Sequence, residues 1–217
     1  MKISIVKNIL SANERFAEQN RAMFRDKGIL VVNLMSSPGA GKTTLLEAMG
    51  QALATRLKIG VIEGDIQTAI DAERVAAAGL QAVQIETEGA CHLDAGMVRD
   101  AAGNLDLEDM DLLVVENVGN LVCPAEFDVG ENFKVMLLSV TEGDDKPLKY
   151  PLMFRQCRAL CISKIDLLPY LRCDIAAMRQ AAISLNPDLK IFEISAYTGQ
   201  GLDEWHQWLL EQAGTGM

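Results

Sequence analysis

Residues 29–44 read ILVVNLMSSPGAGKTT: an apolar, β-branched run, a glycine-containing loop and the start of a helix-forming run. That order is typical of a P-loop, in which loop N–H groups, a helix N-terminus and a lysine bind phosphate. Ser36 stands where the motif G-x-x-x-x-G-K-[ST] has its first glycine. The alternative is a glycine turn with a chance Lys-Thr pair, but the strand–loop–helix context favours a bound nucleoside triphosphate. The predicted nucleotide-binding residues of this loop are Gly39, Ala40, Gly41, Lys42, Thr43 and Thr44.

Seven short runs share the consecutive apolar composition of strands that are buried on both faces. Stretches suited to helices separate them, which indicates βα units and a parallel sheet. We therefore predict an α/β fold, a single P-loop NTPase domain over residues 29–213, with a mostly parallel sheet of about seven strands flanked by helices. Residues 214–217 are expected to be a frayed end. The predicted strands are residues 29–35, 59–62, 82–85, 112–115, 135–140, 159–162 and 191–194.

The N-terminal segment has apolar residues at helical spacing. These residues are Ile5, Ile9, Ala12, Phe16 and Met23. We predict an amphipathic helix within residues 1–28 that packs on the domain.

The composition excludes several classes of protein. The 217 residues are 49% hydrophobic and 23% charged, as in ordinary globular proteins. The net charge of −10 argues against nonspecific binding to nucleic acid or to an anionic membrane. No apolar run approaches the roughly 18 residues of a membrane span, and no signal peptide is visible, so we expect a soluble, cytoplasmic protein. Five cysteines without an export signal predict free thiols.

Acidic residues follow two other predicted strands. Glu116 ends the run LLVVE, and Gly119 beyond it could offer its N–H to a γ-phosphate. Asp65 follows the strand at 59–62, although a helix N-cap is an alternative role for it. We predict that Lys42, Asp65 and Glu116 are catalytic. The predicted Mg²⁺ ligands are Thr43, Asp65 and Glu116.

Two elements near the C-terminus predict the base that is bound. Ser163-Lys164-Ile165-Asp166 resembles the N-K-x-D element of GTPases, with Ser163 in place of the amide. In that element the aspartate accepts two hydrogen bonds from guanine and the lysine stem covers the ring. Ser195-Ala196 matches the S-A element, whose backbone N–H meets the guanine carbonyl. The alternative for Lys164 and Asp166 is a strand-end turn with a solvated lysine.

A second kind of site is suggested by Cys91, His92 and Cys123. Thiolate and imidazole ligands suit Ni²⁺, Zn²⁺ or copper rather than Mg²⁺. Three ligands leave a four-coordinate shell one short, so a second subunit or a water is expected to complete it. The alternative is that the two cysteines are small buried hydrophobes. The remaining cysteines and histidine are assigned to packing, namely Cys157, Cys161, Cys173 and His206.

Taken together, these motifs resemble the HypB family of hydrogenase nickel incorporation GTPases. The resemblance runs from about residue 5 to residue 210 and also includes GDIQT with Asp71 and Arg74, and the segment 139–151. It implies a low-turnover GTPase that dimerises with GTP and holds Ni²⁺, or Zn²⁺ in its place, through Cys91, His92 and Cys123 at the dimer interface. It further implies delivery of nickel to the [NiFe]-hydrogenase large subunit, with the small zinc protein HypA as partner.

Two features bear on that resemblance. The sequence starts directly into its first helix, so we expect no cysteine-rich or histidine-rich nickel-binding extension. Lys146 or Lys149, in the charged segment 143–149, is a candidate to reach the nucleotide of a partner subunit. Other functions remain open at this point: a P-loop kinase or synthetase that uses ATP, a regulatory switch that handles no metal, and a metal-binding protein with a vestigial nucleotide site.

Overall fold

The computed structural model describes the backbone of residues 2–65, 70–87 and 89–215, and the side chains of residues 11–64, 71–87 and 89–214. A seven-stranded sheet runs through the domain in the order β3-β2-β4-β1-β5-β6-β7, and every neighbouring pair is parallel. The strands are β1 (Leu30–Ser36), β2 (Ile59–Asp65), β3 (Gln81–Glu86), β4 (Leu112–Glu116), β5 (Phe133–Ser139), β6 (Cys157–Ser163) and β7 (Lys190–Glu193). The predicted α/β fold with about seven parallel strands is confirmed.

Burial explains why the strands read as apolar runs. Every residue of β1, β4 and β5 is buried, because these central strands carry helices on both faces. The edge strands β3 and β7 are only partly buried. Leu30, Val32 and Leu34 of β1 enter one apolar cluster, whereas Val31 and Met35 enter clusters on the other face, as the two-residue period of a strand requires.

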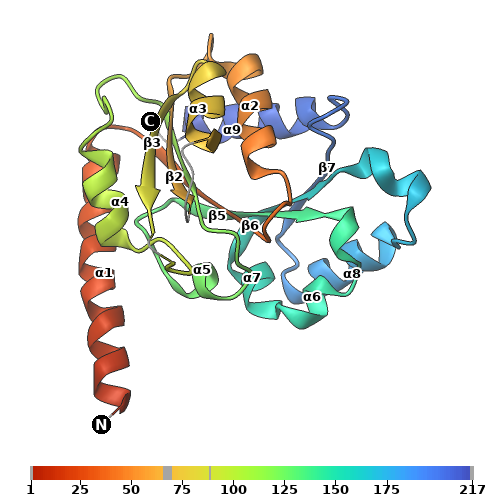
Figure 1. The fold of residues 1–217 in the computed structure, drawn as a ribbon, viewed down its shortest axis with the longest axis horizontal. Helices are drawn as coiled ribbons and strands as arrows, with labels where there is room; N and C mark the ends of the chain where they lie inside the picture. Colours follow the sequence, from red (N-terminus) through yellow and green to blue (C-terminus); the bar gives the residue numbers. More distant parts are fainter. Residues whose placement is uncertain (1, 66–69, 88, 216–217) are drawn as a thin grey trace.

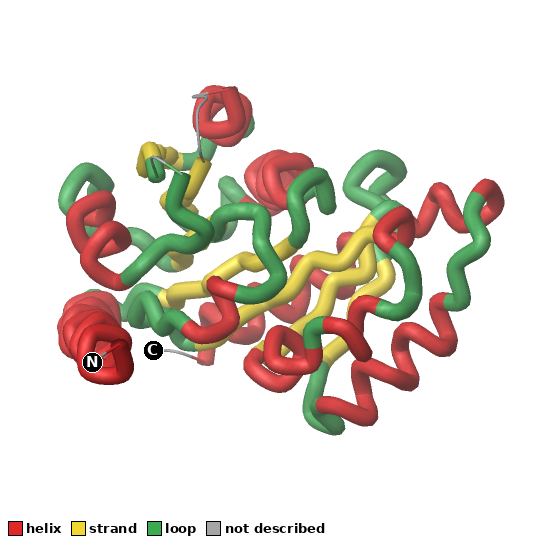
Figure 2. Tube along the Cα trace, turned by 60° about the horizontal axis from the view of Figure 1, so that its bottom comes forward, coloured by secondary structure: helices red, strands yellow, loops and turns green. Residues whose placement is uncertain are grey.

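Helices cover both faces of the sheet (Figures 1 and 2). One face packs against α2 (Lys42–Leu53), α3 (Ile70–Ala77) and α9 (Leu202–Thr215). The other face carries α4 (Ala95–Ala102), α7 (Pro151–Gln156) and α8 (Ile175–Leu185). Short helical turns complete the chain: α5 (Cys123–Glu126), η1 (Val140–Glu142), α6 (Lys146–Lys149) and η2 (Ile165–Tyr170).

The N-terminal helix α1 (Lys2–Asp26) is present as predicted, and it lies beside α4 while its first turns extend past the rest of the domain (Figure 1). Its buried stripe matches the predicted apolar face only in part, since Met23 packs against the core as predicted. Phe16 is 41% exposed, and the residues of the buried stripe are Asn13, Ala17, Asn20 and Phe24. Two asparagines enter this stripe because α1 packs partly on loops whose backbone groups need hydrogen-bond partners. The side chains of Ile5 and Ile9 lie outside the described residues.

Among the described residues, no helix combines the length and apolarity that a membrane span requires.

Candidate functional site

The P-loop joins the central strand β1 to α2, so it opens at the carboxyl edge of the parallel sheet. Gly39 and Gly41 have φ angles of +73° and +102°, a region that favours glycine. Gly41 is the N-cap of α2, which leaves the first N–H groups of that helix directed toward the loop. The sequence therefore forms an anion-binding loop at a helix N-terminus.

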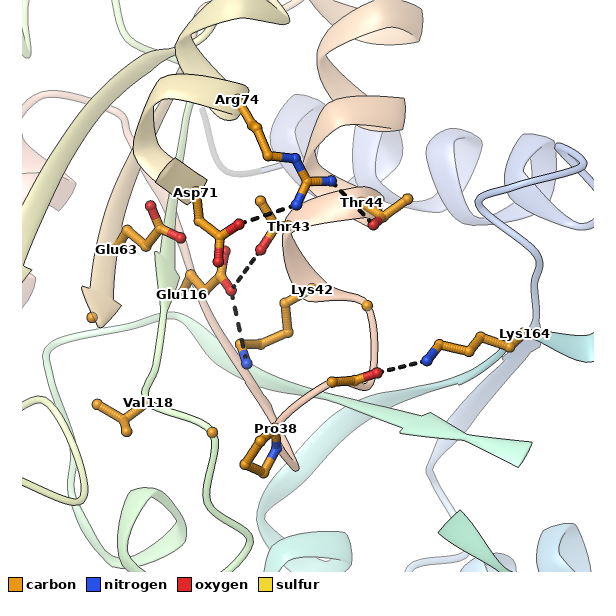
Figure 3. Close-up of a pocket in the computed structure, with 14 residues that line it drawn as sticks. Pro38, Lys42, Thr43, Thr44, Glu63, Asp71, Arg74, Glu116, Val118 and Lys164 are labelled. Atoms are coloured by element: carbon orange, nitrogen blue, oxygen red, sulfur yellow. Dashed lines mark hydrogen bonds and ion pairs between the residues drawn. The ribbon is translucent and has the colours of Figure 1, made fainter. Parts of the chain in front are cut away.

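Lys42 lies between the loop and the end of β4 (Figure 3). Its Nζ donates to Ser36 Oγ at 3.0 Å and lies 3.7 Å from Glu116 Oε1. Thr43 Oγ1 lies 3.5 Å from the same carboxylate oxygen. The Ser36 hydroxyl also donates to the Ser37 carbonyl at 2.6 Å. The serine at the motif's first position is thus accommodated, because its hydroxyl is hydrogen-bonded on both sides.

A cavity of about 480 Å³, called the phosphate cavity here, opens above these residues. The predicted residues that line it include Gly39, Lys42, Thr43, Glu116 and Gly119. The lining also includes side chains to which the sequence motifs gave no site role, among them Glu63, Asp71, Arg74 and Val118, although Asp71 and Arg74 belong to the stated resemblance. The side chain of Asp65, the other predicted Mg²⁺ ligand, lies outside the described residues.

Arg74 and Glu63 shape the far wall of the phosphate cavity (Figure 3). The Arg74 guanidinium is held by Glu47 at 2.6 and 2.9 Å and by Asp71 at 3.1 Å. Glu63 is buried and directed toward Glu116 and Asp71 in the close-up. The sequence could have indicated this role for Glu63, because Glu63 lies near the end of β2, two residues before the predicted Asp65.

A second cavity of about 270 Å³, the base cavity, adjoins the first. Gly41, Thr44 and Lys164 line both cavities, so one ligand could extend through the two. Asp166, Ser195 and Ala196 line the base cavity together with Ala40. All the predicted nucleotide-binding residues therefore face one of these adjoining cavities.

Ser163 and Lys164 tie the base cavity to the P-loop. Ser163 Oγ donates to the Ala40 carbonyl at 2.8 Å, so the serine braces the loop that an asparagine would brace. Lys164 has a φ of +59°, which is uncommon for a residue with a side chain. Its Nζ donates to the Gly39 carbonyl at 2.6 Å, and its stem runs along the cavity wall. The Ser-Lys-x-Asp element is thus an ordered part of the site rather than a solvated turn.

The structure brings Cys91, His92 and Cys123 together. One ligand atom from each lies within 4.8 Å of the others, and Cys91 Sγ is 3.4 Å from His92 Nδ1. We call these three residues the metal-ligand cluster. Cys91 is exposed, whereas His92 and Cys123 are half-buried. The cluster stands on loops that follow β3 and β4, at the same edge of the sheet as the phosphate cavity.

Protonation in the metal-ligand cluster follows from its packing. Burial against Phe127, whose ring centroid is 3.7 Å away, lowers the pKa of His92, while Asp94 and Glu126 partly offset the shift. The hydrogen bond with Cys91, together with burial, raises the pKa of Cys123. The imidazole is therefore ready to bind a cation at neutral pH, but the Cys123 thiol must lose a proton first.

The other cysteines serve packing. Cys157 and Cys161 are buried, Cys173 is half-buried, and all five cysteines of the chain are free thiols, as predicted. Burial raises the pKa of Cys157 to about 12, which disfavours the thiolate that a metal needs. His206 is buried in α9, consistent with the packing role that was predicted.

A buried lysine fixes the turn that carries Cys123. Lys134 Nζ lies 3.6 Å from Glu131 Oε1. Beyond this ion pair, Lys134 donates to backbone carbonyls of α5 and the residue after it, namely those of Pro124, Ala125 and Phe127, at 3.4, 3.0 and 2.8 Å. Because the last carbonyls of a helix otherwise lack partners, this cation stabilises α5 and holds its first residue, Cys123, in place.

Asn13 and Asn20 of α1, the asparagine clasp, connect the two segments that carry the cluster. Asn13 accepts from Ala95 N and donates to Asp128 O, both at 2.8 Å. Asn20 donates to Ala95 O at 2.8 Å and to Val129 O at 3.0 Å. Ala95 follows the Cys91–His92 loop, whereas Asp128 and Val129 follow α5. One helix thus fixes both loops relative to each other.

The parallel sheet with a phosphate-binding loop at its central strand defines a P-loop NTPase fold. The family model described as CobW/HypB/UreG, nucleotide-binding domain, matches residues 30–193. The chain belongs to this family.

Relatives match over most of the chain. The hydrogenase maturation factor HypB of Escherichia coli strain K12 is 51% identical over 205 residues, which cover 94% of this chain and 71% of that protein. HypB of Azotobacter vinelandii is 50% identical over 213 residues, which cover 98% of this chain and 70% of that protein. Within its family, the chain therefore belongs to the HypB hydrogenase maturation factors.

Solved structures of HypB proteins are also similar to this chain. HypB from Helicobacter pylori, crystallised in complex with nickel, superposes with a TM-score of 0.90 at 39% identity, covering 94% of this chain and 96% of that one. HypB from Archaeoglobus fulgidus gives a TM-score of 0.88 at 41% identity, covering 94% and 100%. The signal recognition particle receptor FtsY from Elizabethkingia anophelis shares only the fold. It is 15% identical, with a TM-score of 0.55 over 83% of this chain and 65% of that one.

Proposed function

We propose that this chain is a GTP-hydrolysing nickel metallochaperone. In this proposal it binds Ni²⁺ through Cys91, His92 and Cys123 at the interface of a GTP-dependent homodimer, and assists nickel insertion into the [NiFe]-hydrogenase large subunit. The observation that carries the proposal is the convergence of two thiols and an imidazole within 4.8 Å, at the edge of the sheet where the phosphate cavity opens. The nickel complex of the Helicobacter pylori relative supports the choice of metal.

The phosphate cavity supplies the groups that hydrolysis needs. Lys42 would neutralise the charge that develops on the phosphates, and the N–H groups of the P-loop would hold them in place. Hydroxyl and carboxylate oxygens are ligands that suit Mg²⁺, so Thr43 and Glu116 fit this ion, with Asp65 as the third proposed ligand. Bound Mg²⁺ would neutralise phosphate charge. Gly119 would sense the γ-phosphate through its N–H.

Guanine selectivity is assigned to Asp166. Its carboxylate lines the base cavity and would accept two hydrogen bonds from guanine, which adenine cannot donate in that pattern. Lys164 would cover the ring with its stem, while Ser195 and Ala196 would present backbone N–H groups to the guanine carbonyl. The brace from Ser163 to the P-loop supports an ordered base cavity in spite of the missing asparagine.

The metal shell lies at the interface with the second subunit in this proposal. Three protein ligands per chain are one short of a four-coordinate site, so a ligand from the partner subunit or a water would complete it. Lys146 and Lys149 of α6 remain candidates to act across the interface. Lys149 Nζ is 2.5 Å from Asp145, and Lys146 lies over the Tyr150 ring, so each would leave an existing partner to do so. A small zinc protein related to HypA is the proposed partner in delivery.

The test is a nickel titration of the protein loaded with Mg²⁺ and either GDP or a non-hydrolysable GTP analogue, with molar mass measured by light scattering. We expect the analogue to double the mass and to change the nickel dissociation constant, and Cys123→Ala to abolish the nickel response. Identical nickel binding in both nucleotide states would leave a G-protein switch without a metal cargo. Tighter binding of ATP than of GTP would indicate a kinase-like enzyme instead.

A further inference from the structure

Leu93 stands between the two sites. It directly follows His92 of the metal-ligand cluster, and its side chain is fully buried. Its backbone N–H donates to the side-chain oxygen Oδ1 of Asn117 at 3.0 Å. A buried N–H has no water to replace a lost partner, so the position of this segment depends on Asn117.

In the sequence, Asn117 is next to a residue that lines the phosphate cavity. It follows Glu116 directly at the end of β4, is only 1% exposed, and donates its own backbone N–H to Leu34 O of β1 at 2.9 Å. The same Oδ1 that receives Leu93 also accepts from Val118 N at 3.0 Å, and Val118 lines the phosphate cavity. One oxygen atom therefore joins the wall of the phosphate cavity to the residue after His92.

The other end of the Asn117 amide is also fixed. Its Nδ2 donates to Asn33 Oδ1 at 3.1 Å, and Asn33 is fully buried in β1. The amide thus cannot rotate without loss of a buried hydrogen bond. Because one end is anchored in the central strand, a displacement of Val118 would change the geometry at Leu93 rather than be absorbed by the side chain.

A second contact runs along the same path. A Cβ atom on Gly64 would come within 2.8 Å of Leu93 Cγ, so the leucine side chain packs directly on this glycine backbone. Gly64 lines the phosphate cavity at the end of β2. Leu93 is therefore contacted from both strands that border the phosphate cavity, at its N–H by Asn117 and at its side chain by Gly64.

We propose that Asn117 is a positioning residue that couples the γ-phosphate region to the metal-ligand cluster, by holding Leu93, and with it His92, in a geometry that depends on Val118. This inference rests on the proposed function, since it names the residue through which nucleotide would alter nickel affinity. By reciprocity, nickel would alter nucleotide affinity through the same hydrogen bond. Contact alone does not establish coupling, so the test measures the coupling itself.

The experiment compares nickel dissociation constants with Mg²⁺–GDP and with a Mg²⁺–GTP analogue, in wild-type protein and in Asn117→Ala. We expect a wild-type ratio on the order of 5- to 150-fold and a ratio near one in Asn117→Ala. Asn186→Ala is the matched control. Its amide also makes two backbone hydrogen bonds, to Phe154 O and Cys157 O, at the opposite edge of the sheet, and this variant should keep the wild-type ratio.

A second measurement needs no variant. Residue-resolved amide hydrogen exchange of the wild-type chain should show a protection of the Leu93 N–H that differs between the GDP and GTP-analogue states. This keeps the inference testable even where Asn117→Ala folds poorly. A nucleotide that binds more tightly raises the protection of all amides together, so coupling predicts a change at the Leu93 N–H that exceeds the change at the Asn132 N–H, which donates to Val31 O.

The outcomes separate the two proposals. If wild-type nickel affinity is the same in both nucleotide states, the nucleotide-gated function and the role of Asn117 both fail. If the wild-type ratio is large and Asn117→Ala retains it, or protection of the Leu93 N–H changes no more than that of the Asn132 N–H, only the role of Asn117 fails. A large wild-type ratio that collapses in Asn117→Ala and persists in Asn186→Ala supports both.

Discussion

The phosphate cavity is built from strand ends and buried charge, whereas the metal-ligand cluster stands on loops and is open to solvent. Lys42 and Glu116 have side chains that are 10% and 6% exposed. Cys91, by contrast, is exposed, and its two fellow ligands are half-buried. The first site is positioned by the pairing of parallel strands, and the second by single side chains that reach backbone groups of the loops, from Asn13, Asn20 and Lys134.

This difference indicates how each site should respond to change. A site fixed by a sheet loses function when a group that touches the ligand is removed, and tolerates changes elsewhere. A site fixed by a few side-chain hydrogen bonds should also be sensitive at positions that never touch the metal. The predictions below test this contrast.

The largest effect is expected for Lys42→Ala, which removes a buried cation from the phosphate cavity. The affinity for a GTP analogue should fall on the order of 100- to 1000-fold, measured by calorimetry. Nickel affinity in the absence of nucleotide should stay at the wild-type value. Lys190→Ala, which removes an exposed lysine of β7, is the control. A parallel loss of nickel binding would show that the two sites are not built independently.

Cys123→Ser should weaken nickel binding by about 100-fold, because a soft thiolate ligand is replaced by a poor one. The measurement is a titration followed by thiolate-to-nickel charge-transfer absorbance. Cys173→Ser changes a half-buried cysteine outside the metal-ligand cluster and should bind nickel as the wild type does. Equal losses in both variants would remove Cys123 from the ligand set.

Nickel affinity should rise with pH. The pKa of Cys123 is raised by its hydrogen bond to Cys91 and by burial, so the free thiol is protonated at neutral pH and metal binding must release that proton. Below the thiol pKa, the apparent affinity should increase up to about tenfold per pH unit for each thiol that ionises. The lowered pKa of His92 means that the imidazole adds no proton release above about pH 7. A flat profile from about pH 7 to pH 8.5 would contradict thiolate ligation.

Asn20→Ala tests whether the asparagine clasp acts at a distance. It removes hydrogen bonds to Ala95 O and Val129 O and should weaken nickel binding by about tenfold, a typical effect of groups beyond the direct ligands. Affinity for the GTP analogue should change little. Glu18→Ala, at an exposed position of the same helix, is the control. If urea unfolding shows a loss of stability with nickel affinity intact, the clasp serves the fold alone.

The smallest effect is expected for Ser163→Ala, which removes the brace to the Ala40 carbonyl. Loss of one hydrogen bond of about 1 kcal/mol should lower GDP affinity about fivefold. Ser184→Ala removes a comparable hydroxyl bond, to Ala181 O, on the surface of α8 and should leave GDP affinity unchanged. If Ser163→Ala instead lowers nickel affinity and leaves GDP affinity unchanged, Ser163 does not brace the nucleotide site.

The sequence predicted what is local or periodic. Strands buried on both faces appear as apolar runs, and the P-loop is a short continuous motif, so the sheet and much of the lining of the phosphate cavity could be predicted without a structure. The roles of those residues in nucleotide binding and catalysis, and of Asp65 in particular, stay predictions.

What the sequence could not predict depends on strand order. Cys91 and Cys123 follow different strands of a parallel sheet, so both lie at its carboxyl edge, but only the order β3-β2-β4 places their loops close together along that edge. The buried stripe of α1 was predicted only in part, because periodicity searches for apolar residues such as Met23, whereas this stripe also contains Asn13 and Asn20. Lys134 carried no signal either, since a lysine in an apolar strand gives no indication of the carbonyls that it will meet.

The asparagine clasp also sets an order of assembly. Asn13 bonds across 115 residues to Asp128, and Asn20 across 75 residues to Ala95, whereas the loop that carries Cys91 and His92 lies between the neighbouring elements β3 and α4. Contacts of such long sequence separation form late, and during synthesis Asn13 must wait until Asp128 has left the ribosome. The P-loop is completed later still, because Ser163 bonds across 123 residues to the Ala40 carbonyl, so the nascent chain displays unfixed thiols before either site has formed. Nickel present at that stage would encounter the cysteines before the metal-ligand cluster has assembled.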